Sequence, residues 1–147
     1  MNAIWKWFKG WTHRGPHFVI GDPQQPYMKR WYILPRNPIL NVYLHQFLHD
    51  DDDRALHDHP WPSVSICVKG RLRDITESRR REIGFGGVAI RRSTHAHRIE
   101  LLTPTAWTLF LTGPTLREWG FHCPQGWVHW RDFVDHTNTG NIGKGCG

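Results

Sequence analysis

The sequence is poor in cysteine, with only Cys67, Cys123 and Cys146 among its 147 residues. Three is an odd number, and no pair has the CxxC spacing of a redox or metal motif. A disulfide framework is therefore not expected, and this cysteine usage indicates a reducing compartment. We accordingly predict a cytoplasmic protein.

Long apolar runs are also lacking. No uninterrupted apolar segment is long enough to span a bilayer. The N-terminus does not show the apolar core and small-residue cleavage site of a secretory signal, so none is expected. The ten prolines and fourteen glycines supply frequent turns, which favours many short strands over long helices.

The remaining composition is typical of one globular domain. Hydrophobic residues make up 39% of the chain and charged residues 22%, and the mean hydropathy is −0.56. The formal net charge of +6 permits contact with an anionic partner. A triple arginine indicates nucleic acid only where aromatic platforms or a basic groove accompany it. A solvated hairpin tip over residues 77–82 explains Arg79, Arg80 and Arg81 without such a partner, so no nucleic acid is expected.

Alternating hydrophobicity predicts the fold. The alternation is clearest where Val64, Ile66 and Val68 are separated by small or polar residues. Similar short segments, bounded by turn signals, occur along the chain, and the pattern contains about eight or nine short strands in all. The principal expected strands are 27–34, 41–49, 63–69, 71–76, 88–92, 106–112, 116–121 and 126–130. The pattern predicts an all-β fold, an antiparallel β-barrel or jelly roll that removes or protects strand edges.

Three regions follow from this interpretation: an N-terminal aromatic and basic arm over 1–26, the β-barrel over 27–136, and a flexible Gly-rich tail over 137–147. The aromatic part of the arm could lie on a membrane surface. It spans under three helical turns and is followed by a glycine. We therefore expect a short arm or helix whose rings pack on the barrel wall, and no membrane partner. The acidic run over 50–53 is interpreted as a solvated loop, because adjacent aspartates on a flexible loop form no preorganised cation cage.

Histidines suggest the chemistry. On a strand, residues two apart share a face, so His57 and His59 would present two imidazoles about 6.5 Å apart at the backbone to one side. Asp58, between them, should point to the opposite face. It could be a surface residue, a turn former, or a residue that orients a histidine from a neighbouring strand. Two solvated histidines on a turn are the simpler alternative. A second cluster, His95 and His97, follows another strand-like run and favours a metal site instead.

At these residues the sequence resembles the cupin superfamily. The first cupin motif places a glutamate and a glycine after His-x-His. Here His57-x-His59 is followed at matching spacing by Ser63, in the position of the glutamate, and by Gly70. The second motif is matched at Gly86 and His97. The resemblance covers roughly residues 40–113.

The resemblance implies a small β-barrel or jelly roll that holds one divalent metal through His57, His59 and His97. His95 competes for the third place. Since serine is a poor ligand compared with a carboxylate, the site would be a neutral three-histidine centre with open positions. That is similar to the cupin-type thiol dioxygenases, which hold Fe(II) on three histidines.

The function expected from this resemblance is that of a mononuclear non-haem Fe(II) dioxygenase-like enzyme acting on a small organic molecule. Imidazole does not select one metal, so Ni, Zn and Mn are alternatives to Fe(II). A second hypothesis is a metal-bearing cupin without turnover, acting as a small-ligand binding or structural module, with a possible homodimer through a β edge. Arg91, Arg92 and Arg98 could hold a substrate carboxylate, but exposed strand positions explain them equally well.

Remaining aromatic and thiol side chains carry weaker expectations. Trp61, Trp107 and Trp119 either wall a pocket or belong to the core. Cys67 shares strand parity with Ser63, which predicts a small buried thiol. Cys123 is interpreted as an unactivated loop thiol.

Overall fold

Short strands make up most of the structure, which is a computed structural model describing residues 3–51 and 55–147. A helix lies at each end of the strand sequence. The elements are α1 Ala3–Thr12, β1 Phe18–Gly21, β2 Pro26–Tyr32, β3 Asn41–Phe47, β4 Leu56–His57, β5 Ser63–Lys69, β6 Leu72–Ile75, β7 Arg80–Ile83, β8 Val88–Arg91, β9 Arg98–Leu101, β10 Ala106–Thr112, β11 Gly120–Cys123, β12 Gly126–His129 and α2 Trp130–Phe133.

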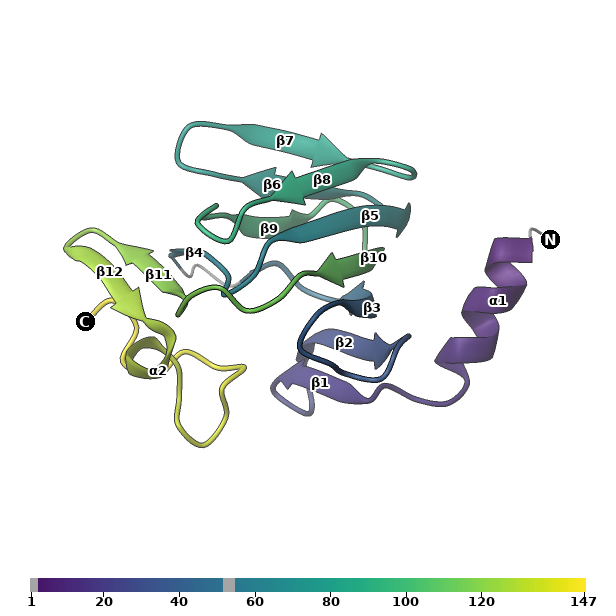
Figure 1. Cartoon of the computed structure of the whole chain (residues 1–147), viewed down its shortest axis with the longest axis horizontal. Helices are drawn as coiled ribbons and strands as arrows, with labels where there is room; N and C mark the ends of the chain where they lie inside the picture. Colours follow the sequence, from purple (N-terminus) through teal and green to yellow (C-terminus); the bar gives the residue numbers. More distant parts are fainter. Residues whose placement is uncertain (1–2, 52–54) are drawn as a thin grey trace.

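The strands form three antiparallel sheets. The largest has the order β1-β2-β3-β10-β5-β8, and two three-stranded sheets have the orders β12-β11-β4 and β7-β6-β9. Every named strand pair is antiparallel. Figure 1 shows the β11–β12 hairpin at one end of the molecule and α1 at the other. The predicted all-β, antiparallel architecture of the jelly-roll class is confirmed.

The predicted strands 63–69 and 106–112 lie inside the large sheet as β5 and β10. Along β10, Ala106, Thr108, Phe110 and Thr112 are buried and the residues between them are half-buried. The inward faces of the large sheet and of the β7-β6-β9 sheet supply one core cluster. Its buried members are Met28, Phe47, Cys67, Leu72, Ile83, Ala89, Ile99 and Ala106. The expectation of a buried Cys67 is confirmed, and burial raises the pKa of its thiol.

Two segments differ from the predicted arrangement. Arg80–Ile83, expected in a hairpin tip, forms β7 and pairs with β6. Glu82 accepts there from both Arg71 and Arg73, so the charges expected on a solvated turn instead join neighbouring strands. Phe18–Gly21 lies in the region expected to be an arm but pairs with β2 as the edge strand β1.

Helix α1 packs on the outer face of the large sheet. Phe8 is buried against the Trp107 ring at a centroid distance of 4.9 Å, beside Trp31 and Leu44. This is the packing that we expected for the aromatic arm. Within residues 3–51 and 55–147, no helix has the length and apolar character needed to cross a membrane.

The C-terminal segment returns to the sheets. Cys123, at the end of β11, is joined to Cys146 by a disulfide, so the expectation of unpaired cysteines is wrong. Hairpin β11–β12 and α2 bring together two residues separated by 23 positions, which spacing alone does not show. Disulfides persist in oxidising compartments. The disulfide therefore favours an oxidising compartment over the cytoplasm. The cytoplasmic location remains only a prediction from the sequence.

Reduction of this disulfide tests the pairing directly. Alkylation of the denatured, unreduced protein is expected to label one thiol, that of Cys67, and alkylation after reduction to label all three. The Cys146→Ser variant is expected to lose about 3 kcal/mol of unfolding free energy, because the bond closes a loop and restricts the unfolded chain. Mass spectrometry and urea denaturation are the measurements. Three labelled thiols before reduction would contradict the pairing. The Cys67→Ser variant is the control, because no thiol should be labelled in it before reduction.

Gly70, between β5 and β6, is a second testable position. Its φ is +77°, and an added Cβ would lie 2.3 Å from the carbonyl oxygen of Thr105. Gly70→Ala is therefore expected to cost about 2–4 kcal/mol, from backbone strain plus the clash. Gly86 has nearly the same φ, +76°, but open space around it. Gly86→Ala is the matched control and should cost only about 1 kcal/mol in urea denaturation. Equal losses in the two variants would contradict this account.

Candidate metal centre

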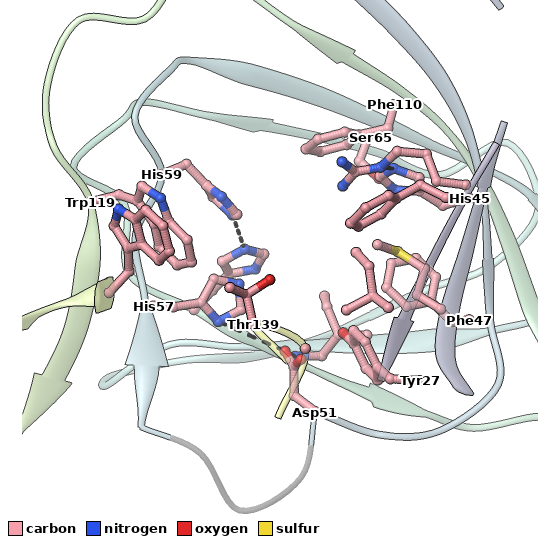
Figure 2. Close-up of a pocket in the computed structure, with 18 of the residues that line it drawn as sticks. Tyr27, His45, Phe47, Asp51, His57, His59, Ser65, Phe110, Trp119 and Thr139 are labelled. Carbon is pink, nitrogen blue, oxygen red and sulfur yellow. Dashed lines mark hydrogen bonds and ion pairs between the residues drawn. The ribbon is translucent and has the colours of Figure 1, made fainter. Parts of the chain in front are cut away.

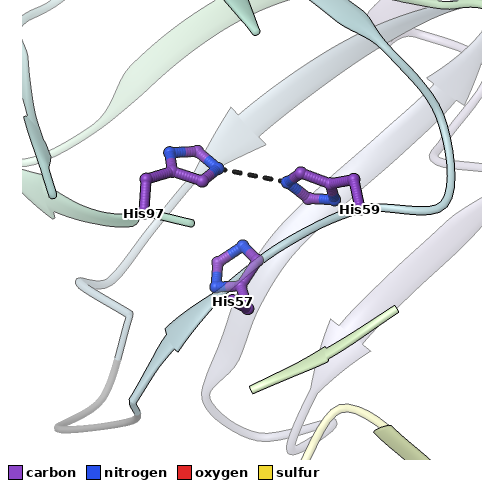
Figure 3. Close-up of side chains that lie close together, drawn as sticks. All are labelled: His57, His59 and His97. Carbon is purple, nitrogen blue, oxygen red and sulfur yellow. Dashed lines mark hydrogen bonds between the residues drawn. The ribbon is translucent and has the colours of Figure 1, made fainter. Parts of the chain in front are cut away.

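Three histidines meet where β4 approaches the start of β9. The backbone N–H of His57 donates to the carbonyl of His97 at 2.9 Å, and the N–H of His97 donates to the carbonyl of His57 at 3.0 Å. His59 follows His57 by two residues. The imidazoles of all three point toward a common space (Figure 3). Main-chain pairing therefore brings the two histidine clusters of the sequence together.

The spacing of the ring nitrogens suits one ion. Nε2 of His59 lies 3.1 Å from Nε2 of His97, and one nitrogen from each of the three rings lies within 4.8 Å of the others. Two imidazole nitrogens bound to one ion at about 2.1 Å, with an angle of about 90–110° between them, lie about 3.0–3.4 Å apart. His57, His59 and His97, called the histidine triad below, could therefore hold a metal ion.

The protonation states also suit a metal. Burial lowers the pKa of His97 to about 4. Burial, with the neighbouring His57 and His97, lowers the pKa of His59 well below its usual range. Both imidazoles are thus neutral near pH 7. A neutral imidazole offers the lone pair that a metal needs, and no proton has to be displaced from it.

Asp74 orients His97. Its Oδ1 lies 2.5 Å from Nδ1 of His97 and accepts a hydrogen bond at 3.0 Å from the buried Arg91. Although burial acts in the opposite direction, the bonds from His97 and Arg91 lower the pKa of Asp74 to about 2. An ionised Asp74 keeps the proton of His97 on Nδ1 and leaves the Nε2 lone pair directed at His59. In metal sites, a carboxylate commonly accepts the second ring N–H of a metal-binding histidine and so fixes its tautomer and orientation.

Sequence reasoning missed Asp74. The available signal was its position: Leu72 and Asp74 are two apart on β6, and both are buried. A carboxylate at an inward strand position needs a buried partner. Of the two alternatives for the third histidine, His97 lies in the triad, whereas His95 lies outside it with its Nε2 4.0 Å from Asp74. Arg91, considered earlier as an exposed strand residue or a substrate ligand, is instead buried in this pair.

Asp51 does not belong to a solvated loop, contrary to our expectation for residues 50–53. It is buried, its Oδ2 accepts from the backbone N–H of Ile99 at 2.8 Å, and the same oxygen lies 3.9 Å from Nδ1 of His57. Asp50 accepts from the N–H of Leu101. The two aspartates thus satisfy backbone donors of β9. The rest of the acidic run, 52–53, lies outside the described residues.

Asp58 points away from the triad, as expected from strand alternation, but it is not a surface residue. It is 1% exposed and accepts hydrogen bonds from the N–H of Gly120, from His122 and from Trp127. These bonds outweigh burial and lower the pKa of Asp58. The carboxylate thereby fixes the β11–β12 hairpin against the loop that carries His57 and His59.

A cavity of about 410 Å³ contains the triad. Figure 2 shows His57, His59 and Trp119 on one side of this space. The ring of His59 stacks on Trp61 at 4.7 Å and lies 6.5 Å from Trp119. Of the tryptophans considered as pocket walls, these two line the cavity, whereas Trp107 packs against Phe8. Other apolar lining residues are Met28, Phe47, Leu72, Ile99, Phe110 and Phe121.

Ser63 and Ser65 lie on the same face of β5 with different surroundings. Ser63, in the position of the cupin glutamate, is buried, and its hydroxyl has no hydrogen-bond partner among the described residues. Ser65 lines the cavity. In the described part of the chain, the cluster that could hold a metal consists of histidines alone.

Comparison with known proteins identifies the fold. No protein-family model matches the sequence, and no curated protein does. Among solved structures, the chain is similar to a cupin superfamily protein from Desulfitobacterium hafniense, with a TM-score of 0.52, 10% identity and coverage of 59% of this chain and 77% of the other. It is also similar to KdgF from Halomonas sp., with a TM-score of 0.52, 18% identity and coverage of 70% and 89%.

A third similar structure is the DMSP lyase DddQ from Ruegeria pomeroyi, with a TM-score of 0.56 and 18% identity. This chain spans only 60% of the length of DddQ, while 78% of this chain is covered. The chain therefore has the cupin fold. In particular, it is a small cupin-fold protein in which three histidines converge inside the cavity and could hold a metal.

Proposed function

We propose that the protein is a metal-binding cupin in which His57, His59 and His97 hold one divalent transition metal. The observation that carries the proposal is the convergence of three imidazoles inside a cavity, with two of them held neutral and one oriented by Asp74. Neutral imidazole nitrogens suit Fe, Ni and Zn. We take Fe(II) as the native metal, with Ni, Zn or Mn as alternatives.

The reaction we propose is dioxygenase-like oxidation of a small organic molecule. When bound, Fe(II) would supply the capacity to bind and activate dioxygen. The triad would supply three nitrogen ligands to the ion, and the cavity beside it would receive the small substrate. The aromatic side chains of Trp61, Phe110 and Trp119 line this space.

The proposed partner is a small molecule, with no nucleic acid and no membrane. A homodimer through a β edge is compatible with the proposal. Strand β8 is an edge of the large sheet, and its Ile90 side chain is 80% exposed. Light scattering across a range of concentrations would show whether a dimer forms.

Metal analysis of freshly purified protein tests the function first. About one equivalent of metal is expected, either as purified or after incubation with Fe(II), Ni(II) or Zn(II) and removal of excess. Iron-loaded protein is then expected to consume oxygen with a suitable small acid or thiol, and the metal-free protein is the control. A stoichiometric metal without oxygen uptake would favour a small-ligand binding or structural module. Failure to bind any of the three metals would overturn the proposal.

A further inference from the structure

The cavity has a second polar end, formed by three neighbouring strands. Arg30 on β2 is the register partner of His45 on β3, and His45 is the register partner of Thr108 on β10. The three side chains therefore form a row across the large sheet, and all of them line the cavity. Figure 2 shows His45 across the open space from His57 and His59.

Arg30 brings a positive charge into this space, and within residues 3–51 and 55–147 it has no counter-ion. Its Nε donates to Nε2 of His45 at 2.9 Å, and its guanidinium lies over the ring of Tyr43 at 4.7 Å. Ionisable groups near it include three tyrosines, Arg36 and His45, and among the described residues no carboxylate forms an ion pair with it. Placing a charge in such surroundings without a paired opposite charge is unfavourable. An anion in the cavity would pair with the half-buried guanidinium.

His45 supplies orientation rather than charge. It is 3% exposed, and burial, followed by the charge of Arg30, lowers its pKa well below the usual range. The ring is thus neutral, and its Nε2 accepts the Arg30 hydrogen bond, which places the ring proton on Nδ1. Because Nε of Arg30 is used in this bond, the two terminal nitrogens of the guanidinium remain as the fork available to a ligand.

Thr108 adds a buried donor without a partner. Its side chain is 2% exposed, and its Oγ1 has no hydrogen-bond partner among the described residues. A buried hydroxyl left unsatisfied costs free energy, and such groups in native structures usually have a role or a bound partner. Thr108 lies on the strand next to His45, and it lines the cavity.

We propose that Arg30 and Thr108 form the binding site for the carboxylate of a small organic acid, whose apolar body lies between Met28, Phe47 and Phe110. A carboxylate matches the planar fork of a guanidinium, and a single arginine balances one negative charge. The cavity volume of about 410 Å³ lies within the usual range of small-ligand pockets, about 300–1,000 Å³. The part of the ligand remote from the carboxylate would face the triad, and only this last step rests on the proposed function.

Binding to metal-free protein tests the site independently of the metal. Hexanoate and benzoate are the probes, hexanamide and benzamide are their uncharged counterparts, and inorganic phosphate tests for a general anion site. By isothermal titration calorimetry, each carboxylate is expected to bind at least about 10-fold more tightly than its amide, because charge-assisted hydrogen bonds are the stronger ones. It should also bind more tightly than phosphate. Equal binding of acid and amide, or tighter binding of phosphate, would overturn the proposal.

Substitutions locate the binding. Arg30→Gln is expected to weaken carboxylate binding about 10–100-fold, as expected when a charge-assisted pair is lost, and to leave amide binding unchanged. Arg80→Gln, at an exposed arginine outside the cavity lining, is the control and should bind like the parent. Thr108→Val keeps the side-chain volume and should weaken carboxylate binding about 3–10-fold, which tests the site even if Arg30→Gln fails to fold. Unchanged affinity in either folded cavity variant would contradict the assignment.

Metal content separates this inference from the proposed function. Arg30→Gln should retain the metal of the parent protein, because Arg30 is not a member of the triad. Carboxylate binding without any metal binding would leave the acid site in place and remove the proposed enzyme. Metal binding with no preference for carboxylates would remove the acid site and leave the proposed metal centre in place.

Discussion

His97→Ala is expected to abolish stoichiometric metal binding, whereas His95→Ala should leave about one equivalent bound. His97 places Nε2 3.1 Å from Nε2 of His59 and is oriented by Asp74. His95 is half-buried and lies outside the triad. Loss of an orienting partner alone lowers metal affinity by about 10–100-fold, so loss of a ligand should exceed this. Elemental analysis after gel filtration measures the effect.

The two alanine variants control for each other, because both remove an imidazole from the same short segment. Thermal denaturation of the metal-free forms shows whether His97→Ala is folded. A folded His97→Ala that keeps its metal, together with loss of metal in His95→Ala, would make His95 the third ligand. Equal retention by both variants would place the metal elsewhere.

Asp74→Ala is expected to destabilise the metal-free protein by about 3–5 kcal/mol, because it leaves the charge of Arg91 buried and unpaired. Arg91 is 5% exposed, and its Nε already has no partner among the described residues. The same change removes the acceptor for Nδ1 of His97. A fall in metal affinity of about 10–100-fold is therefore expected as well. Urea denaturation and metal titration are the two measurements.

Glu82→Ala is the matched control for stability. Glu82 also pairs with arginines, and it lies on β7, next to the strand that carries Asp74, but it is exposed. Water screens such a pair, so its loss should change stability far less. The double variant Asp74→Leu/Arg91→Met should recover much of the stability lost in Asp74→Ala, since both charges are removed together. A double variant less stable than Asp74→Ala would contradict this explanation.

The sequence alone predicted the class of fold and the shared face of His57 and His59, and it left His95 and His97 as alternatives for the third histidine. Period-two alternation in residues 63–69 and the β-prone composition of residues 106–112 predicted strands that the structure contains as β5 and β10. Alternation reports that the two faces of a strand differ, and that property is local. Which face is buried was decided by packing, because Ser63 and Cys67 are buried in β5 whereas Val64, Ile66 and Val68 are half-buried. The His-x-His spacing likewise predicted that His57 and His59 share a face, and the structure places them with His97.

The partners of these residues were decided only by tertiary structure. Asp74 meets His97 because β6 pairs with β9 in one register, and Arg30, His45 and Thr108 form a row because three strands align. Cys123 reaches Cys146 through the fold of the hairpin and α2. Strand parity fixes the side on which a residue lies, but not which distant strand lies beside it. That choice depends on the register and order of strands separated by tens of residues, which are set by packing of the whole core.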